Sequence, residues 1–176
     1  MIEQPTYRIR AARPAEADIL RAIESAAGQA FVAVGYGDIA EQEDTTVPAL
    51  RAAAVAGRLL VIIDAADHPA GFILCRDLDG DLHVQELDVH PDHAGRRLGA
   101  RLLDAAGDIA RTRGLPALSL TTFRSVPWNA PYYARLGFRE MLPGEYGPDL
   151  RMELARQQAA GFPMADRVAM RRELVS

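Results

Sequence analysis

The sequence predicts a single domain of mixed α/β (α+β) class over residues 1–176, in which helices flank a central, mostly antiparallel mixed sheet of about seven strands. Three observations carry this prediction. The chain has 176 residues, 49% of them hydrophobic and 25% charged, which suits one globular core. Apolar runs of strand length alternate with helical patterns that begin near proline and end near glycine. No repeat or low-complexity linker divides the chain.

The N-terminal part of the chain predicts one strand and two helices. Residues 7–12 alternate as a short strand. Residues 13–28 repeat apolar side chains at helical spacing, with Pro14 near the start and Gly28 just past the expected end. Residues 47–57 have the same helix start and end signals, with a proline near the beginning and a glycine at the end. The side chains expected on one face of the first helix are Ile19, Leu20 and Ile23.

Three strands follow, at residues 58–64, 70–78 and 82–89, because these runs are apolar or alternating and rich in β-branched residues. The second and third runs are separated by Asp79-Gly80, a dipeptide that strongly favours a two-residue hairpin turn. The sequence therefore predicts an antiparallel meander in this region.

The C-terminal half predicts three helices and three strands. The first helix begins at Arg97 and ends at Gly114. Its expected apolar face comprises Leu98, Leu102, Ala105 and Ile109. The other predicted elements are strands at residues 115–123, 138–142 and 167–174 and helices at residues 129–137 and 147–161.

Composition excludes several classes of function. The net charge of -4 argues against general binding to nucleic acids, which depends on clustered Lys and Arg. Cys75 is the only cysteine, which excludes an intramolecular disulfide framework and a cysteine-based zinc cluster. No signal-peptide core or membrane-length apolar run is present. We therefore expect a soluble cytoplasmic protein with no nucleic-acid or membrane partner.

The stretch HPDHAGRRLGARLL, residues 90–103, joins a strand to a helix. The first turn of a helix has unpaired N–H groups that bind anions. Gly95 and Gly99 allow a ligand to approach the backbone, and Arg96 and Arg97 add positive charge. The alternative is a tight turn with solvated arginines. The two common nucleotide-binding glycine motifs, the P-loop and the dinucleotide fingerprint, are both absent.

Two motifs taken together resemble the GNAT superfamily of acyl-CoA-dependent N-acetyltransferases. ELDVHPDHAGRRLGARLL resembles the family's strand, loop and Leu-rich helix, with the pattern [QR]-x-x-G-x-[GA] falling on residues 94–99. NAPYYARLGF resembles its second signature, an Asn followed by a helix ending in Tyr-x-x-x-Gly-Phe. The order of elements agrees from Tyr7 to Leu174. The resemblance implies a sheet that splays between its fourth and fifth strands.

Two residues depart from the first family motif. Ala94 stands where Gln or Arg is usual, and Arg97 stands where glycine is usual. Arginine can replace glycine where φ is negative, as in the first turn of a helix. We therefore expect Arg97 to have a negative φ and the backbone cradle to be retained.

The resemblance implies acetyl-CoA as co-substrate and no metal. The backbone of Leu87, Asp88 and Val89 would pair with the pantetheine arm like an added strand. Asn129 would hydrogen-bond the same arm, or it would serve only as a helix N-cap. His90 and His93 flank Asp92, but loop histidines of this kind are usually solvent-exposed rather than metal ligands. The residues expected around the pyrophosphate are Ala94, Gly95, Arg96, Arg97, Leu98, Gly99 and Ala100.

The implied reaction is acetyl transfer to a primary amine by direct attack through a tetrahedral intermediate. Tyr133 has the family position of the general acid that protonates the CoA sulfur, although it could also be a core aromatic. Glu86 is the candidate base, through a water molecule because an ordinary glutamate is weakly basic. His83 is its rival, on the opposite face of the strand. The Val89 amide would stabilise the oxyanion.

The acceptor amine is not identified by the sequence. Tyr36 and Trp128 could form an aromatic wall. The residues that could attract a cationic amine are Asp38, Glu41, Glu43 and Asp44. A homodimer is one candidate assembly. Two other functions remain open: a catalytically silent acyl-CoA-binding or sensing domain and, more weakly, a doubly wound nucleotide-binding protein, against which the hairpin counts.

Overall fold

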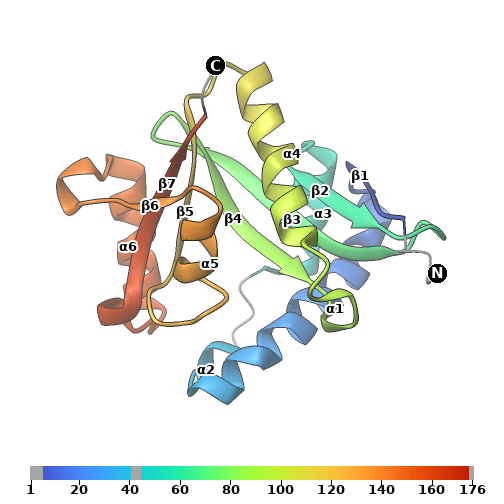
Figure 1. The fold of residues 1–176 in the computed structure, drawn as a ribbon, viewed down its shortest axis with the longest axis horizontal. Helices are drawn as coiled ribbons and strands as arrows, with labels where there is room; N and C mark the ends of the chain where they lie inside the picture. The colour runs from blue at the N-terminus through green and yellow to red at the C-terminus, as the bar shows by residue number, and fades with distance from the viewer. Residues whose placement is uncertain (1–5, 41–44, 175–176) are drawn as a thin grey trace. The chain divides into compact units, whose positions relative to one another are not determined.

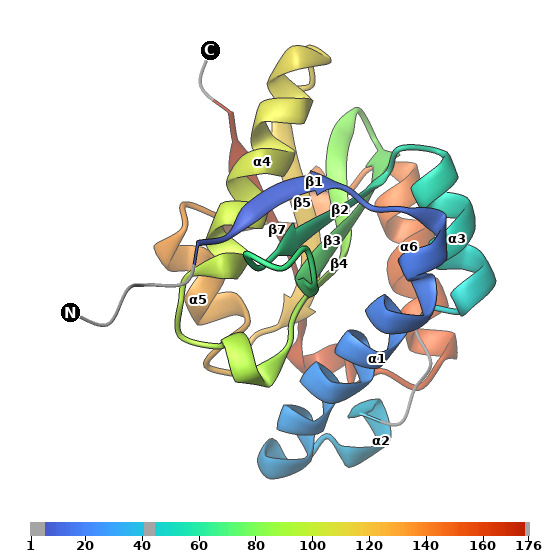
Figure 2. The same cartoon turned by 90° about the vertical axis from the view of Figure 1, so that its right-hand side faces the viewer.

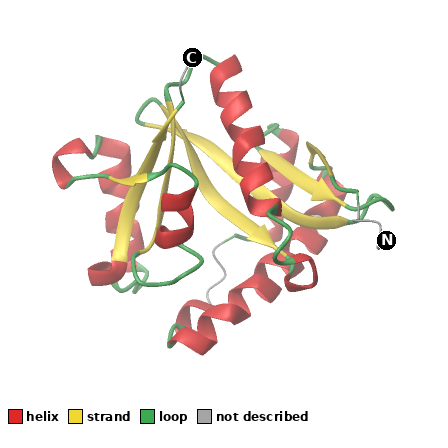
Figure 3. Ribbon diagram, viewed as in Figure 1, coloured by secondary structure: helices red, strands yellow, loops and turns green. Residues whose placement is uncertain are grey.

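The computed structural model describes residues 6–40 and 45–174 and contains a seven-stranded sheet in the order β1-β2-β3-β4-β5-β7-β6 (Figure 1). The strands are β1 (Arg8–Ala11), β2 (Leu59–Ile63), β3 (Pro69–Leu78), β4 (Asp81–Val89), β5 (Ala117–Phe123), β6 (Arg139–Glu140) and β7 (Arg167–Glu173). The helices, drawn in red in Figure 3, are α1 (Ala17–Gly28), α2 (Gly37–Ala40), α3 (Val47–Val55), α4 (Leu98–Thr112), α5 (Ala130–Arg135) and α6 (Pro148–Ala159).

The sheet is mixed and mostly antiparallel, which confirms the predicted fold class. β1 pairs with β2, β2 with β3, β5 with β7 and β6 with β7 in antiparallel fashion, whereas β4 and β5 are parallel. The parallel ladder joins residues 82–84 to residues 118–120 and ends there, as a splay between the fourth and fifth strands requires. Asp79 and Gly80 have positive φ values of 49° and 85°, which suit the predicted hairpin turn between β3 and β4.

The chain divides into two compact units. Unit 1 comprises residues 1–75 and 86–105, and unit 2 comprises residues 76–85 and 106–176. Because β3, β4 and α4 each contribute residues to both units, the boundary falls within elements rather than in a linker. The prediction of one domain over the whole chain stays a prediction.

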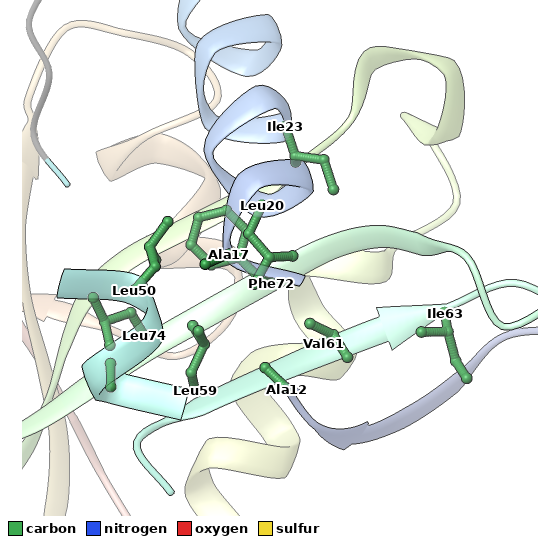
Figure 4. Packing of buried hydrophobic residues seen from close by; sticks show 11 residues of the cluster. Ala12, Ala17, Leu20, Ile23, Leu50, Leu59, Val61, Ile63, Phe72 and Leu74 are labelled. Carbon is green, nitrogen blue, oxygen red and sulfur yellow. The ribbon is translucent and has the colours of Figure 1, made fainter. Parts of the chain in front are cut away.

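Unit 1 has an apolar core between helices and strands. Figure 4 shows Ala17 and Leu20 of α1 close to Phe72 of β3, and Leu50 of α3 close to Leu74. Figure 2 shows β1 lying beside β2, its antiparallel partner. The core cluster comprises Ala12, Ala17, Leu20, Ile23, Leu50, Ala53, Leu59, Val61, Ile63, Phe72 and Leu74.

The first long helix differs from the prediction in its end and in its buried face. Gly28 has a helical φ of -58°, so the prediction that it lies past the helix end is wrong. The chain continues as a 3-10 helix, η2 (Gln29–Val34), until Gly35 adopts a left-handed φ of 86°. Ile19 is 43% exposed, and Ala17 replaces it on the buried face.

The long helix α4 also buries a different face from the predicted one. Leu98 and Leu102 are buried as expected, but Ile109 is 37% exposed and Ala105 is only partly buried. The remaining buried positions of α4 are Ala100, Leu103, Ala106, Gly107 and Ala110. No helix in the described part of the chain is long and apolar enough to cross a membrane.

Unit 2 confirms the predicted C-terminal helix and strand. Leu150 of α6 packs with Leu78, Met141 and Ala169 in a second apolar cluster. The carboxylate of Asp79, in the β3–β4 turn, accepts hydrogen bonds from the backbone N–H groups of residues 149 and 150, at 3.1 and 2.8 Å. These N–H groups lie in the first turn of α6, so the hairpin turn caps this helix.

Candidate functional site

The C-terminal end of β4, in unit 1, passes very close to β3. A Cβ atom added to Gly71 would lie 2.6 Å from the carbonyl oxygen of Asp88 and 3.2 Å from Cα of Val89. No side chain fits at that distance, so glycine is required for the approach. The parallel ladder with β5 does not use the backbone of residues 87–89. These residues therefore retain backbone groups for another extended chain.

The loop after β4 contains two left-handed residues. His90 donates its N–H to the carbonyl of Ala70 at 2.9 Å, and a single 3-10 turn, η3 (Pro91–His93), follows. Gly95 has φ of 74° and Arg97 has φ of 58°. The expectation of a negative φ at Arg97 is therefore wrong. Arg97 keeps the conformation that glycine favours, because it precedes α4 instead of lying in its first turn.

The backbone of this loop presents several N–H groups at the start of α4. Arg101 is the first residue whose N–H bonds back into the turn, to the carbonyl of Arg97 at 3.2 Å. The N–H groups of Leu98, Gly99 and Ala100 precede it and have no acceptor within the helix. Left-handed residues beside a helix N-terminus form an anion-binding concavity. This backbone fits a diphosphate.

The two arginines of the loop differ in their surroundings. Within the described residues, the exposed Arg97 side chain makes no hydrogen bond and no ion pair. The Arg96 guanidinium instead donates hydrogen bonds to the Tyr7 hydroxyl and the Asp92 carbonyl, and it lies 3.2 Å from Nδ1 of His93. Sequence reasoning missed Tyr7 and Gly71. An isolated glycine in an apolar strand could have indicated Gly71, but nothing local indicates a contact of Tyr7 with a loop more than 80 residues away.

The second motif lies in unit 2, around α5. Asn129 occupies the N-cap position but makes no side-chain capping bond, which counts against a purely structural role as an N-cap. Asn129 is only 9% exposed, and its carboxamide has no hydrogen-bond partner among the residues that the structure describes. The carboxamide is therefore available to hydrogen-bond a ligand.

Tyr133 is held at the middle of α5. Its N–H donates to the carbonyl of Asn129 at 2.9 Å, and its carbonyl accepts from Leu136 and Phe138. Its ring makes edge contacts with the rings of Tyr132 and Phe138, each at a centroid distance of 5.7 Å. The side chain is partly buried, so packing on two sides fixes it while part of it faces solvent.

The two candidate bases on β4 have different environments. Glu86 is partly buried, in unit 1. His83, in unit 2, is 2% exposed, and its Nδ1 lies 2.9 Å from Oγ of Ser119. Burial, together with the positive charge of Arg76, lowers the pKa of His83 to about 4. An enclosed imidazole of this kind is poorly suited to meet a substrate, which favours Glu86.

Unit 2 also contains a buried carboxylate with several donors. The Glu153 side chain is 6% exposed and accepts hydrogen bonds from Arg76 at 2.6 Å, Arg156 at 2.7 Å and Gln157 at 2.8 Å. Burial raises the pKa of Glu153, but the hydrogen bonds from Arg156 and Gln157 outweigh it and lower the pKa to about 2. This carboxylate is an ionised structural group.

The residues proposed for the acceptor amine lie in separate segments. Tyr36, between η2 and α2, is partly buried, and Asp38 is exposed. Trp128 is 40% exposed in the loop before α5. Glu41, Glu43 and Asp44 lie outside the described residues. Among residues 6–40 and 45–174, no group of three or more His, Cys, Asp or Glu side chains could hold a metal ion.

Comparison with known proteins gives one consistent result. The chain resembles a GNAT-family acetyltransferase from Staphylococcus aureus Mu50, at 15% identity and a TM-score of 0.74, over 97% of this chain and 100% of that one. It resembles PaiA N-acetyltransferase from Thermoplasma acidophilum in complex with coenzyme A, at 16% identity and a TM-score of 0.72, over 96% and 99% of the two chains.

A third similar structure is a longer protein. N-acetylglutamate synthase from Neisseria gonorrhoeae, in complex with coenzyme A and N-acetylglutamate, matches at 15% identity and a TM-score of 0.75, over 99% of this chain and 36% of that one. At these identities the solved structures establish the fold. The family model described as "Acetyltransferase (GNAT) family" matches residues 20–138, which is more than half of the chain. The chain therefore belongs to the GNAT family of acetyltransferases.

Proposed function

We propose that this protein transfers the acetyl group of acetyl-CoA to the nitrogen of a primary amine. The observation that carries the proposal is the loop before α4, where Gly95 and Arg97 are left-handed and the first amides of the helix are available to an anion. Membership of the family supports acyl transfer. Two similar structures that contain coenzyme A support the choice of co-substrate.

The residues around this loop would hold acetyl-CoA in three ways. The backbone of residues 87–89 would pair with the pantetheine arm as an added strand. The amides of residues 95–100, after Ala94, would bind the diphosphate, and the exposed Arg97 guanidinium would add charge. In unit 2, the carboxamide of Asn129 would hydrogen-bond the pantetheine arm, which would satisfy a polar group that is otherwise unpaired among the described residues.

The chemistry requires a neutral amine, a stabilised oxyanion and a proton for the leaving thiolate. The amine nitrogen attacks the thioester carbonyl carbon, and a tetrahedral intermediate forms. The Val89 N–H would donate a hydrogen bond to its oxyanion. When the C–S bond breaks, the Tyr133 hydroxyl would donate its proton to the sulfur and give CoA thiol. The amide product keeps the acetyl group.

The proton released by the amine also needs an acceptor. Glu86 would receive this proton through a water molecule, because an ordinary carboxylate is too weak a base to take a proton directly from an ammonium group. The buried, hydrogen-bonded state of His83 supports the choice of Glu86 over that residue. The acceptor is proposed as a primary amine, with Tyr36 and Trp128 as candidate contacts and Asp38 as a candidate source of attraction for a cation.

The test is release of CoA thiol from acetyl-CoA in the presence of a panel of amines. We expect release that depends on an amine, and we expect Tyr133→Phe to lower kcat by about 100-fold with acetyl-CoA affinity nearly unchanged. Tyr132→Phe is the matched control, because it removes the neighbouring hydroxyl, and it should leave kcat within about twofold.

Two results would count against this proposal. Tight binding of acetyl-CoA with no turnover on any amine would favour a catalytically silent acyl-CoA-binding domain. An unchanged kcat in Tyr133→Phe, when pre-steady-state kinetics place chemistry before product release as the slow step, would remove Tyr133 from the mechanism.

A further inference from the structure

Tyr7, just before β1, makes a compact hydrogen-bonded cluster with the loop that follows β4. Its side chain is 8% exposed, and its hydroxyl oxygen lies 2.8 Å from Nδ1 of His93. Arg96 Nη1 donates to the Tyr7 hydroxyl at 2.8 Å and to the Asp92 carbonyl at 3.1 Å, and it lies 3.2 Å from Nδ1 of His93. All of these residues belong to unit 1.

Part of the hydrogen-bond direction in this cluster follows from the chemistry of the side chains. A guanidinium only donates, so the Tyr7 hydroxyl and the Asp92 carbonyl are the acceptors of the two Arg96 Nη1 protons. The Tyr7 hydroxyl also hydrogen-bonds Nδ1 of His93, in a direction set by the imidazole tautomer. The Tyr7 and His93 rings also meet edge to face at a centroid distance of 5.8 Å. The cluster therefore joins Tyr7 to the loop through a hydrogen bond and a ring contact with His93 and a hydrogen bond from Arg96.

Tyr7 also contacts the chain on the far side of the loop. Its backbone carbonyl accepts a hydrogen bond from Arg101 Nη2 at 2.8 Å. Arg101 is the fourth residue of α4, whereas His93 precedes the loop. One residue therefore anchors both ends of the segment 94–100, which contains the two left-handed positions, Gly95 and Arg97.

The segment between these anchors needs support. A left-handed arginine is less stable than a right-handed one, so the surrounding structure must hold it in place. Backbone hydrogen bonds from Ala94 to Pro91 and from Arg101 to Arg97 give part of this support. Gly95 has no side chain, and the Arg97 side chain has no partner among the described residues. The contacts through Tyr7 add side-chain support from outside the loop.

We propose that Tyr7 is a positioning residue for acetyl-CoA binding, which acts through His93 and Arg96 to hold the loop 94–100 with its amides directed at the diphosphate. The inference rests on the proposed function of that loop. Tyr7 itself contacts neither the reacting atoms nor, in this scheme, the ligand. Its removal should therefore weaken acetyl-CoA binding and leave the chemical step intact.

The first test is Tyr7→Phe, which keeps the ring and removes both hydroxyl hydrogen bonds. We expect the KM and the Kd for acetyl-CoA to rise about 5- to 10-fold, with kcat within about twofold. Tyr146→Phe is the matched control, because its hydroxyl makes a single long bond of 3.4 Å to the Met141 carbonyl in unit 2. It should change neither constant. A Tyr7→Phe enzyme with wild-type KM, or with lower kcat at unchanged KM, would overturn the proposal.

The second test uses His93 and separates positioning from a general loss of structure. His93→Ala should raise the KM as Tyr7→Phe does, and the effects of the two substitutions should be less than additive in the double variant, because both remove the hydrogen bond between Tyr7 and His93. His93→Asn puts an acceptor oxygen near the position of Nδ1, so it should restore a KM close to that of the wild type. Additive effects, or no rescue by asparagine, would contradict the proposed contact.

A measurement without ligand distinguishes this inference from the proposed function. Amide hydrogen exchange at residues 95–97 should be several-fold faster in Tyr7→Phe than in the wild type or in Tyr146→Phe. If the wild type fails to bind acetyl-CoA, the proposed function is wrong, and acetyl-CoA positioning is wrong with it. If the wild type binds acetyl-CoA but exchange at these amides is unchanged in Tyr7→Phe, only the role of Tyr7 is overturned.

Discussion

The loop before α4 in unit 1 differs from the buried polar network of unit 2 in how its charged and polar groups are used. The network comprises Glu153 with its three donors and, separately, the pair formed by His83 and Ser119. In the loop, the first helix amides and the Arg97 guanidinium have no partner among the residues that the structure describes, and Gly95 and Arg97 are left-handed. Unused donors together with strain, and not the density of polar groups, distinguish a binding site from a stabilising network.

The largest expected effect is that of Gly71→Ala, which acts beside the loop. The new Cβ would lie 2.6 Å from the Asp88 carbonyl oxygen, so the backbone of residues 88 and 89 must move. We expect a loss of about 3 kcal/mol in the free energy of unfolding and a fall of more than about tenfold in kcat/KM. Gly144→Ala is the control, since its Cβ would meet no atom within 4 Å. Equal behaviour of the two variants in chemical denaturation and kinetics would contradict the close-approach argument.

The second prediction concerns acid stability and belongs to the network. Burial lowers the pKa of His83 to about 4, so between pH 6.5 and 4 the unfolded chain binds a proton that the folded protein does not. Above the unfolded pKa, His83 is neutral in both states and does not reduce the stability of the fold. As the pH falls toward the folded pKa of about 4, proton binding by the unfolded chain lowers the free energy of unfolding. From pH 7 to 4.5, this group should lower the free energy of unfolding by about 2 kcal/mol. In urea titrations, His83→Asn should show a smaller pH slope over this range. An identical slope would mean that groups other than His83 cause the loss of stability at acid pH.

The third prediction tests whether the network serves stability alone. Glu153→Gln removes a negative charge that pairs with Arg76 and Arg156. Arg76 is partly exposed and Arg156 is exposed, so solvent screening limits the loss of stability. We expect the free energy of unfolding to fall by about 1 kcal/mol and the KM for acetyl-CoA to stay unchanged. A change in this KM comparable to that of a loop variant would remove the contrast between the two regions.

The smallest expected effect is that of Arg97→Gly, which should raise stability and weaken acetyl-CoA binding. Glycine removes about 1–2 kcal/mol of left-handed strain from the folded state, but it also stabilises the unfolded chain by about 0.4–1 kcal/mol through its greater backbone entropy. The free energy of unfolding should therefore rise by about 0.5–1 kcal/mol. The KM for acetyl-CoA should rise about threefold, and less at high salt, because a charge is lost. Thermal unfolding and kinetics at two salt concentrations test both parts. A stabilised variant with unchanged affinity would leave Arg97 without a role in binding.

Much of the fold could be predicted because its signals are local. The Asp79-Gly80 turn, the apolar strands and the C-terminal helix and strand all appeared at the predicted places. The first helix ran past Gly28 because glycine can also adopt helical φ, so its position alone does not end a helix. Ile19 and Ile109 were misplaced because spacing defines an apolar stripe but not the part of it that is covered.

The site was harder to predict than the fold. The motif located the loop, but the φ of Arg97 depends on the chain around it and contradicted the local rule that non-glycine residues avoid left-handed conformations. The contact of Tyr7 with His93 joins residues 86 positions apart, and no sequence pattern marks it. The functions of Tyr133, Glu86 and Asn129 stay predictions until they are measured.

The most direct test of the account is amide hydrogen exchange of the wild-type protein with and without saturating CoA. If the loop is the diphosphate site, the amides of residues 95–100 should exchange markedly more slowly when CoA is bound, because they become donors to phosphate oxygens. Binding of CoA that slows exchange elsewhere and leaves these six amides unchanged would contradict the central claim.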